Sequence, residues 1–93
     1  MKVIMVEPFR PAYMAEIGAD LKSMQKAVGG DIETVYPYTD PLVLVCDEEG
    51  KINGKERNRA LVSDNGEIYD VVFGTFFIAG IGDEEFASVP DNL

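Results

Sequence analysis

Catalytic chemistry has few possible carriers in this chain, because the sequence contains no histidine. General acid–base catalysis would have to use carboxylates, tyrosines or lysines whose pKa values the fold has tuned. The chain has 17 Asp and Glu residues, most of them in segments that read as turns or in the C-terminal tail. Solvated carboxylates there would titrate normally, so we predict no catalytic residue. A pair of carboxylates that only folding brings together is the alternative, and it would make the protein a carboxylate-based enzyme.

The single cysteine, Cys46, is the other candidate nucleophile. One thiol excludes an intrachain disulfide and a four-thiolate zinc site, and the lack of histidine excludes mixed cysteine–histidine sites. Cys46 follows the apolar run Leu42 to Val45, which predicts a buried strand. Burial raises the pKa of a thiol, and the neighbouring Asp47 would raise it further. We therefore interpret Cys46 as an inert core residue.

Two short motifs resemble ligand-binding loops but lack their chemistry. Counting a calcium loop from Asp47 puts Lys51 at the fifth position and Ile52 at the sixth, where an oxygen ligand and glycine are needed. Gly80-Ile81-Gly82 follows an apolar run like a phosphate loop, but the acidic residues 83–85 come next and would repel phosphate. We predict neither a metal nor a cofactor.

The only cluster of basic residues is Lys55, Arg57 and Arg59, with Asn58 inside it. Such a patch could contact a phosphate or an acidic partner, although Glu56 lies within it and charged turns are common on plain surfaces. We take Arg57, Asn58 and Arg59 as candidate partner contacts.

Two tyrosines on either side of Pro37 are further candidates, because tyrosine is enriched at protein interfaces. Tyr36 ends an alternating segment and is expected in the core. Tyr38 is the candidate for partner contact.

The formal charge of −9 argues against direct binding to nucleic acid or to an anionic membrane. Acid is concentrated at Asp47 to Glu49 and at residues 83–85, which allows an inhibitor that occupies a basic, nucleic-acid-binding surface. Solubility alone is the simpler explanation. No signal peptide or membrane-spanning run is seen, and one free thiol suits a reducing compartment, so we expect a cytoplasmic protein.

The elements that must position these residues begin with a hairpin and a helix. Lys2 to Glu7 and Ala12 to Ile17 read as two strands, separated by Pro8 and Pro11, which bracket Phe9 and Arg10. The helix is predicted over Asp20 to Val28, with Asp20 as N-cap, a core face of Leu21, Met24 and Val28, and a stop at the Gly29-Gly30 pair.

Later segments supply the strands of the core. Leu42 to Cys46 and the uncharged run Phe73 to Ile81 are apolar on both faces, as in interior strands. Arg57 to Val62 is expected to form one helical turn or irregular backbone. Together these features predict one α+β domain over residues 1–93, with a mostly antiparallel or mixed sheet and one principal helix. Residues 83–93 are predicted to be an acidic tail anchored by Phe86 and Val89.

Four patterns in order along the chain resemble a known family. They are LKSMQKAVGGDIETVYP (21–37), LVCDEEGKING (44–54), NRAL (58–61) and IYDVVFGTFFIAG (68–80). This sequence is similar to the bacterial and phage family catalogued as domain of unknown function 3846. The resemblance implies a small cytoplasmic protein of the kind carried by phages and mobile elements of Gram-positive bacteria. It implies no activity and no site residues.

We therefore expect a small acidic accessory protein that binds another protein and is not an enzyme. The acidic inhibitor and the carboxylate-based enzyme are the alternatives. An exposed apolar patch would favour the binding module, and a pocket with converging carboxylates would favour the enzyme.

Overall fold

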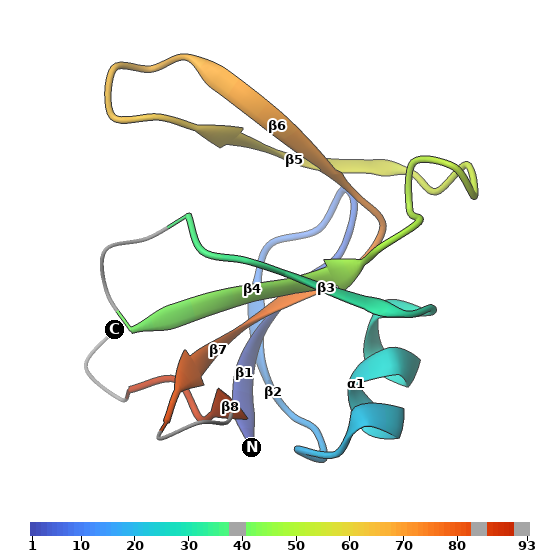
Figure 1. The fold of residues 1–93 in the computed structure, drawn as a ribbon, viewed down its shortest axis with the longest axis vertical. Helices are drawn as coiled ribbons and strands as arrows, with labels where there is room; N and C mark the ends of the chain where they lie inside the picture. Colours follow the sequence, from blue (N-terminus) through green and yellow to red (C-terminus); the bar gives the residue numbers. More distant parts are fainter. Residues whose placement is uncertain (38–40, 83–85, 91–93) are drawn as a thin grey trace.

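A computed structural model describes residues 1–37, 41–82 and 86–90. In these ranges the chain forms one antiparallel sheet of six strands, covered by one helix and, on its other side, by a separate two-stranded hairpin (Figure 1). The elements are β1 Lys2–Val6, β2 Tyr13–Glu16, α1 Leu21–Val28, β3 Ile32–Val35, β4 Leu42–Asp47, β5 Arg57–Val62, β6 Ile68–Phe73, β7 Phe76–Ile81 and β8 Phe86–Ala87. The predicted antiparallel sheet with one helix is confirmed, in a domain that is mostly β.

The main sheet has the order β2-β1-β7-β4-β3, with β8 paired to the end of β7. The predicted opening hairpin is present as β1–β2, with Val3 opposite Ala15. β7 lies between β1 and β4, so the most apolar strands occupy the centre of the sheet. Alternate residues of these strands point to opposite faces, and both faces are covered.

The helix covers one face of the sheet. Met24 and Val28 of α1 pack with Val3, Val43 and Phe77 in a buried cluster. The predicted caps are confirmed, since the Asp20 carboxylate accepts a hydrogen bond from the Ser23 amide and Gly29 has a left-handed backbone with φ of 78°. Leu21 is 54% exposed, so its predicted place in the core is wrong. It is the first residue of the helix, and the buried side chains of Met24 and Val28 lie further along.

The β5–β6 hairpin covers part of the opposite face. Leu61 and Val72 from the hairpin pack with Leu44, Cys46 and Phe76. Residues 57–62 were expected as a helical turn or irregular backbone, and that prediction is wrong because they pair along β6. The register shifts twice, between Arg57 and Arg59 and between Leu61 and Val62, and these irregularities hide the alternation of a strand.

The long apolar run from Phe73 divides into two strands. Gly74 has φ of 81°, which lets the chain leave the hairpin at the end of β6 and enter the main sheet as β7. Near the C-terminus, Val89 is buried and its amide donates to the Lys2 carbonyl oxygen, as expected of an anchor. No helix in the described part of the chain is long and apolar enough to cross a membrane.

Candidate protein-binding surface

The loop between β1 and β2 contains the one unusual backbone conformation among the described non-glycine residues. The Arg10 amide donates to the Glu7 carbonyl oxygen, which closes a β-turn with Pro8 and Phe9 at its centre. Phe9 has φ of 63°. Because proline holds φ near −65°, this combination defines a type II turn, in which glycine is preferred at the position of Phe9.

Phe9 also places a whole aromatic ring in solvent. Its side chain is 82% exposed, so it gains little from burial in the isolated domain. A left-handed backbone costs an ordinary L-residue about 1–2 kcal/mol. The fold thus keeps a large apolar residue at a position where glycine would be less strained and where the ring makes no core contact. Strain of this kind is often found at functional sites.

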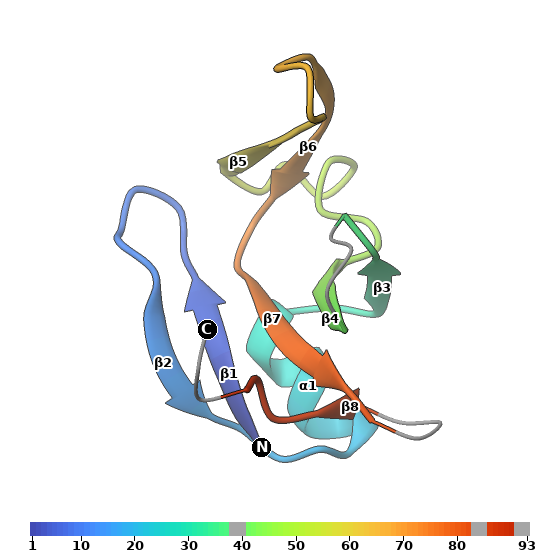
Figure 2. The same cartoon turned by 90° about the vertical axis from the view of Figure 1, so that its left-hand side faces the viewer.

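Contacts from two neighbouring elements hold the loop in place. The Tyr13 hydroxyl donates to the Glu7 carboxylate at 2.5 Å, and this hydrogen bond raises the pKa of Tyr13, with smaller contributions from burial and from the charge of Glu7. From β5, Nη2 of Arg59 donates to the Arg10 carbonyl oxygen at 2.9 Å. Figure 2 shows the β1–β2 loop on the same side of the molecule as β5. The ring of Phe9 is therefore presented from a fixed loop.

Asn58 joins the loop's base to the hairpin. Its side-chain amide donates to the carbonyl oxygens of Val6 and Gly74, both at 2.8 Å. Asn58 is half-buried, and these bonds satisfy carbonyl groups at the points where β1 ends and β7 is about to begin. Asn58 thus has a structural role, and its role as a partner contact stays a prediction.

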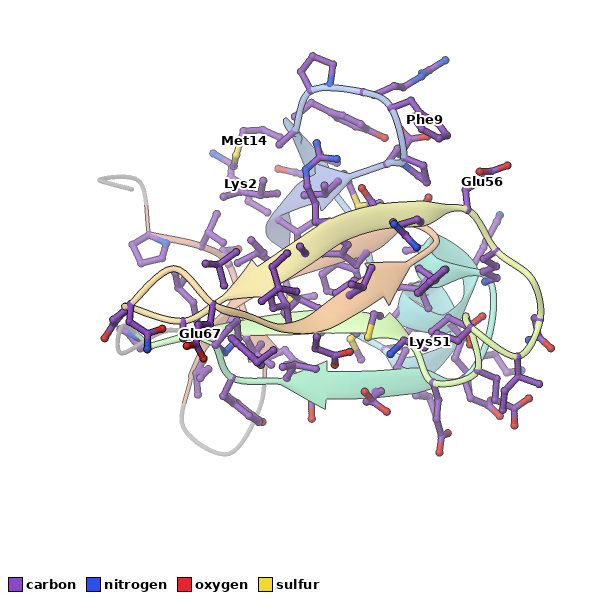
Figure 3. All side chains as sticks on the ribbon, turned by 90° about the horizontal axis from the view of Figure 1, so that it is seen from above. Lys2, Phe9, Met14, Lys51, Glu56 and Glu67 are labelled. Atoms are coloured by element: carbon purple, nitrogen blue, oxygen red, sulfur yellow. The ribbon has the colours of Figure 1, made fainter. Side chains whose placement is uncertain are left out.

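Of the arginines predicted as contacts, Arg59 reaches this loop and Arg57 lies two positions before it on the same strand. Arg57 and Arg59 are exposed on β5, and Arg10 is exposed on the loop itself. These are the only three arginines of the chain. In Figure 3, Phe9 and Glu56 lie at the same end of the molecule, and Lys51 lies on the opposite side of the hairpin. We name Phe9, Arg10, Arg57 and Arg59 the Phe9 face.

Lys55, the first member of the predicted basic cluster, does not join the Phe9 face, because its side chain turns to the end of α1. Tyr38 lies outside the described residues. Tyr36 is 63% exposed, so its predicted burial is wrong. Strand β3 ends at Val35, and the alternation that would have carried Tyr36 into the sheet stops before it.

Lys55 instead forms an ion pair with the buried Asp47 carboxylate and fastens the helix to the sheet. Its ammonium nitrogen lies 2.5 Å from Oδ2 of Asp47 and donates to the carbonyl oxygens of Val28 and Gly29. The Asp47 side chain is 1% exposed. Burial acts to raise the pKa of Asp47, but Lys55 and the Glu49 amide outweigh it and hold the pKa below its ordinary value. Asp47 is therefore buried and paired, so it does not contribute an exposed carboxylate to the predicted acidic cluster.

A groove of about 220 Å³ runs between the hairpin and the sheet and reaches Cys46. Burial, followed by the charges of Glu33, Asp70 and Asp47, raises the pKa of Cys46 to about 11. The prediction of a buried thiol with a raised pKa is confirmed, and such a thiol is a poor nucleophile. Asp70, which also lines the groove, is paired with Lys51 at 2.9 Å. Across residues 1–37, 41–82 and 86–90, no group of three acidic or cysteine side chains is arranged to hold a metal ion.

Phe9 is the residue that sequence reasoning did not select. A signal was present, because an aromatic residue between Pro8 and Pro11 belongs to a turn and has no strand or helix to bury it. The positive φ and the contact with Arg59 depend on tertiary structure.

The whole chain matches one family. The model of the family described as domain of unknown function (DUF3846) matches residues 1–93, and the chain therefore belongs to that family. No curated protein and no solved structure matches this chain. The expected resemblance is thereby confirmed.

Proposed function

We propose that this domain is a non-enzymatic protein-binding module and that the Phe9 face is its contact surface. The observation that supports this is the exposed ring of Phe9 on a strained turn that a glycine would fit better. Phenylalanine and arginine are both enriched at protein interfaces relative to the rest of the protein surface. A fixed loop also reduces the entropy lost when a partner binds.

The test compares three forms of the protein as bait in a lysate of a bacterium that carries a gene of this family. They are the wild type, Phe9→Gly and the control Ile52→Gly. Ile52 is 83% exposed and lies on the β4–β5 connection, so the control removes an equally exposed apolar side chain elsewhere. We expect proteins retained by the wild type and by Ile52→Gly to be lost from Phe9→Gly, as measured by quantitative mass spectrometry.

Folding is checked in the same samples by urea unfolding. Phe9→Gly should unfold within about 1 kcal/mol of the wild type, because relief of the left-handed strain offsets the greater freedom of the unfolded chain. Identical capture by all three forms would contradict the proposal, and so would equal losses from Phe9→Gly and Ile52→Gly.

An acidic inhibitor is the second candidate, supported by the acidic corner where β3 and β4 meet. The Glu48 amide donates to the Asp31 carbonyl oxygen, and Glu33 pairs with Cys46 across the two strands. Exposed Asp31, Glu33, Glu48 and Glu49 therefore gather at one end of the sheet. The other predicted acidic cluster, residues 83–85, lies outside the described residues. We rank this candidate second because none of the four residues of the corner has a strained left-handed backbone like that of Phe9.

A further inference from the structure

The charge of the Phe9 face differs from that of the rest of the molecule. Its three arginines and the neighbouring Glu7 and Glu56 sum to +1. The whole chain carries −9, so everything else carries −10. All five lysines belong to that remainder. A surface that concentrates every arginine in an acidic protein is complementary to a negatively charged ligand.

The arginines of this face have different tasks. Arg59 is engaged by the loop, since its guanidinium bonds to Asn58 and to the Arg10 carbonyl oxygen. The guanidinium groups of Arg10 and Arg57 make no hydrogen bond or ion pair with any residue that the structure describes. Each presents a planar set of donors that fits a carboxylate in a bidentate manner. Arg10 follows Phe9 directly in the loop, and Arg57 lies on β5 two positions before Arg59, which contacts the loop.

We propose that the Phe9 face binds an acidic segment of a partner protein, with an apolar side chain packed on Phe9 and carboxylates paired with Arg10 and Arg57. This inference rests on the proposed function and specifies the chemistry of the partner. The apolar contact supplies the burial that Phe9 lacks in the free domain. The arginines favour a segment that carries carboxylates, and their charges attract it over a longer range than the apolar ring does.

Nucleic acid is the other polyanion that arginine and phenylalanine could hold. Its binding relies on many phosphate contacts along a basic groove, with strong repulsion from acidic surface. Here only two arginines are available and the surrounding molecule carries −10. A protein segment needs only a few carboxylates, so the charge distribution favours it.

The probe is a phage-displayed library of random 12-residue peptides, selected in parallel on wild type, Phe9→Gly and Ile52→Gly. We expect peptides that depend on Phe9 to be enriched in Asp or Glu next to aromatic or large aliphatic residues. Enrichment of basic or uncharged sequences among Phe9-dependent peptides would overturn this inference and leave the proposed function standing. A library that yields no Phe9-dependent sequence would contradict the proposed function itself.

The strongest peptide is then synthesised and its affinity measured by fluorescence anisotropy. The double variant Arg10→Gln with Arg57→Gln should weaken binding by about 10-fold or more, the loss expected for charge-assisted hydrogen bonds. The matched control, Lys22→Gln with Lys26→Gln on α1, removes the same charge from exposed positions and should change affinity by less than about 2-fold. Equal losses from both variants would mean that only net charge matters and would overturn the proposal.

Binding to nucleic acid is tested with a labelled 12-nucleotide oligothymidine. We expect no saturable binding to the wild type under the conditions used for the peptide. Saturable binding that is lost in the double arginine variant, at an affinity equal to or above that of the peptide, would assign the face to nucleic acid instead.

Discussion

At the scale of single residues, Phe9, Asp47 and Cys46 show how the surroundings of a side chain decide what it does. Phe9 is apolar and exposed because a proline turn holds it outside the core. Asp47 is charged and buried because Lys55 reaches it from the β4–β5 connection. Cys46 is a potential nucleophile whose thiol is kept protonated by its surroundings.

The Asp47–Lys55 pair should make stability depend on acid. Because the folded state lowers the pKa of Asp47, its contribution is complete well above the ordinary value and is lost as pH falls through the folded pKa. We expect Asp47→Asn to destabilise the domain by about 2 kcal/mol at pH 7. The difference from wild type should shrink between pH 5 and about pH 2, as measured by urea unfolding. A difference that stays constant over this range would contradict the assignment.

Cys46 should react slowly while the domain is folded. Its burial and the pKa of about 11 leave little thiolate at pH 8. We expect a thiol reagent to label the native protein at least about 100-fold more slowly than the protein in 6 M guanidinium. A model peptide with one cysteine gives the intrinsic rate. Rapid labelling of the native protein would reopen the hypothesis of a nucleophile.

At the scale of elements, short connections decide how the layers meet. The chain passes from β6 to β7 through Gly74 and Thr75, and Asn58 ties that passage to the end of β1. The end of α1 is fastened by Lys55 in a similar way. Lys55 lies on the β4–β5 connection and Asn58 lies at the start of β5, so this part of the chain links the helix, the sheet and the hairpin.

Gly29 is the element boundary that a substitution tests most directly. Its φ of 78° is unfavourable for a β-branched residue, and a Cβ atom there would lie 3.0 Å from Nζ of Lys55. We expect Gly29→Val to destabilise the domain by more than about 1 kcal/mol. Gly54→Val is the control, because Gly54 has φ of 70° but open space around it. It should cost less, and an unchanged melting temperature of Gly29→Val would contradict this account.

At the scale of the whole molecule, basic and acidic side chains gather at different places: β1 leads to the Phe9 face and β4 to the acidic corner, from the same end of the sheet but on either side of β7. The Phe9 face holds the arginines, and the corner formed by Asp31, Glu33, Glu48 and Glu49 holds acid. The two proposed functions therefore use different surfaces. They can be separated by substitutions that leave the core untouched.

Charge reversal at Glu48 and Glu49 tests the acidic corner. If this corner binds a basic surface of a partner, the double variant Glu48→Lys with Glu49→Lys should weaken capture of that partner. Association of the wild type should also slow steeply as salt rises from 50 to 300 mM. Each exposed substitution should change stability by only about 0.5 kcal/mol. We expect partner capture to survive this reversal and to be lost in Phe9→Gly. The opposite pattern would favour the acidic inhibitor.

The sequence by itself determined the features that depend on near neighbours. The caps of α1 at Asp20 and Gly29 and the buried run from Leu42 to Cys46 follow from residue types within a few positions. Tertiary structure alone decided the features that depend on distant partners. Arg57–Val62 became a strand because β6 was there to pair with it, and its register shifts concealed the pattern. Asn58, Lys55 and Arg59 likewise acquired their roles from backbone atoms far along the chain, which no local pattern of residues can specify.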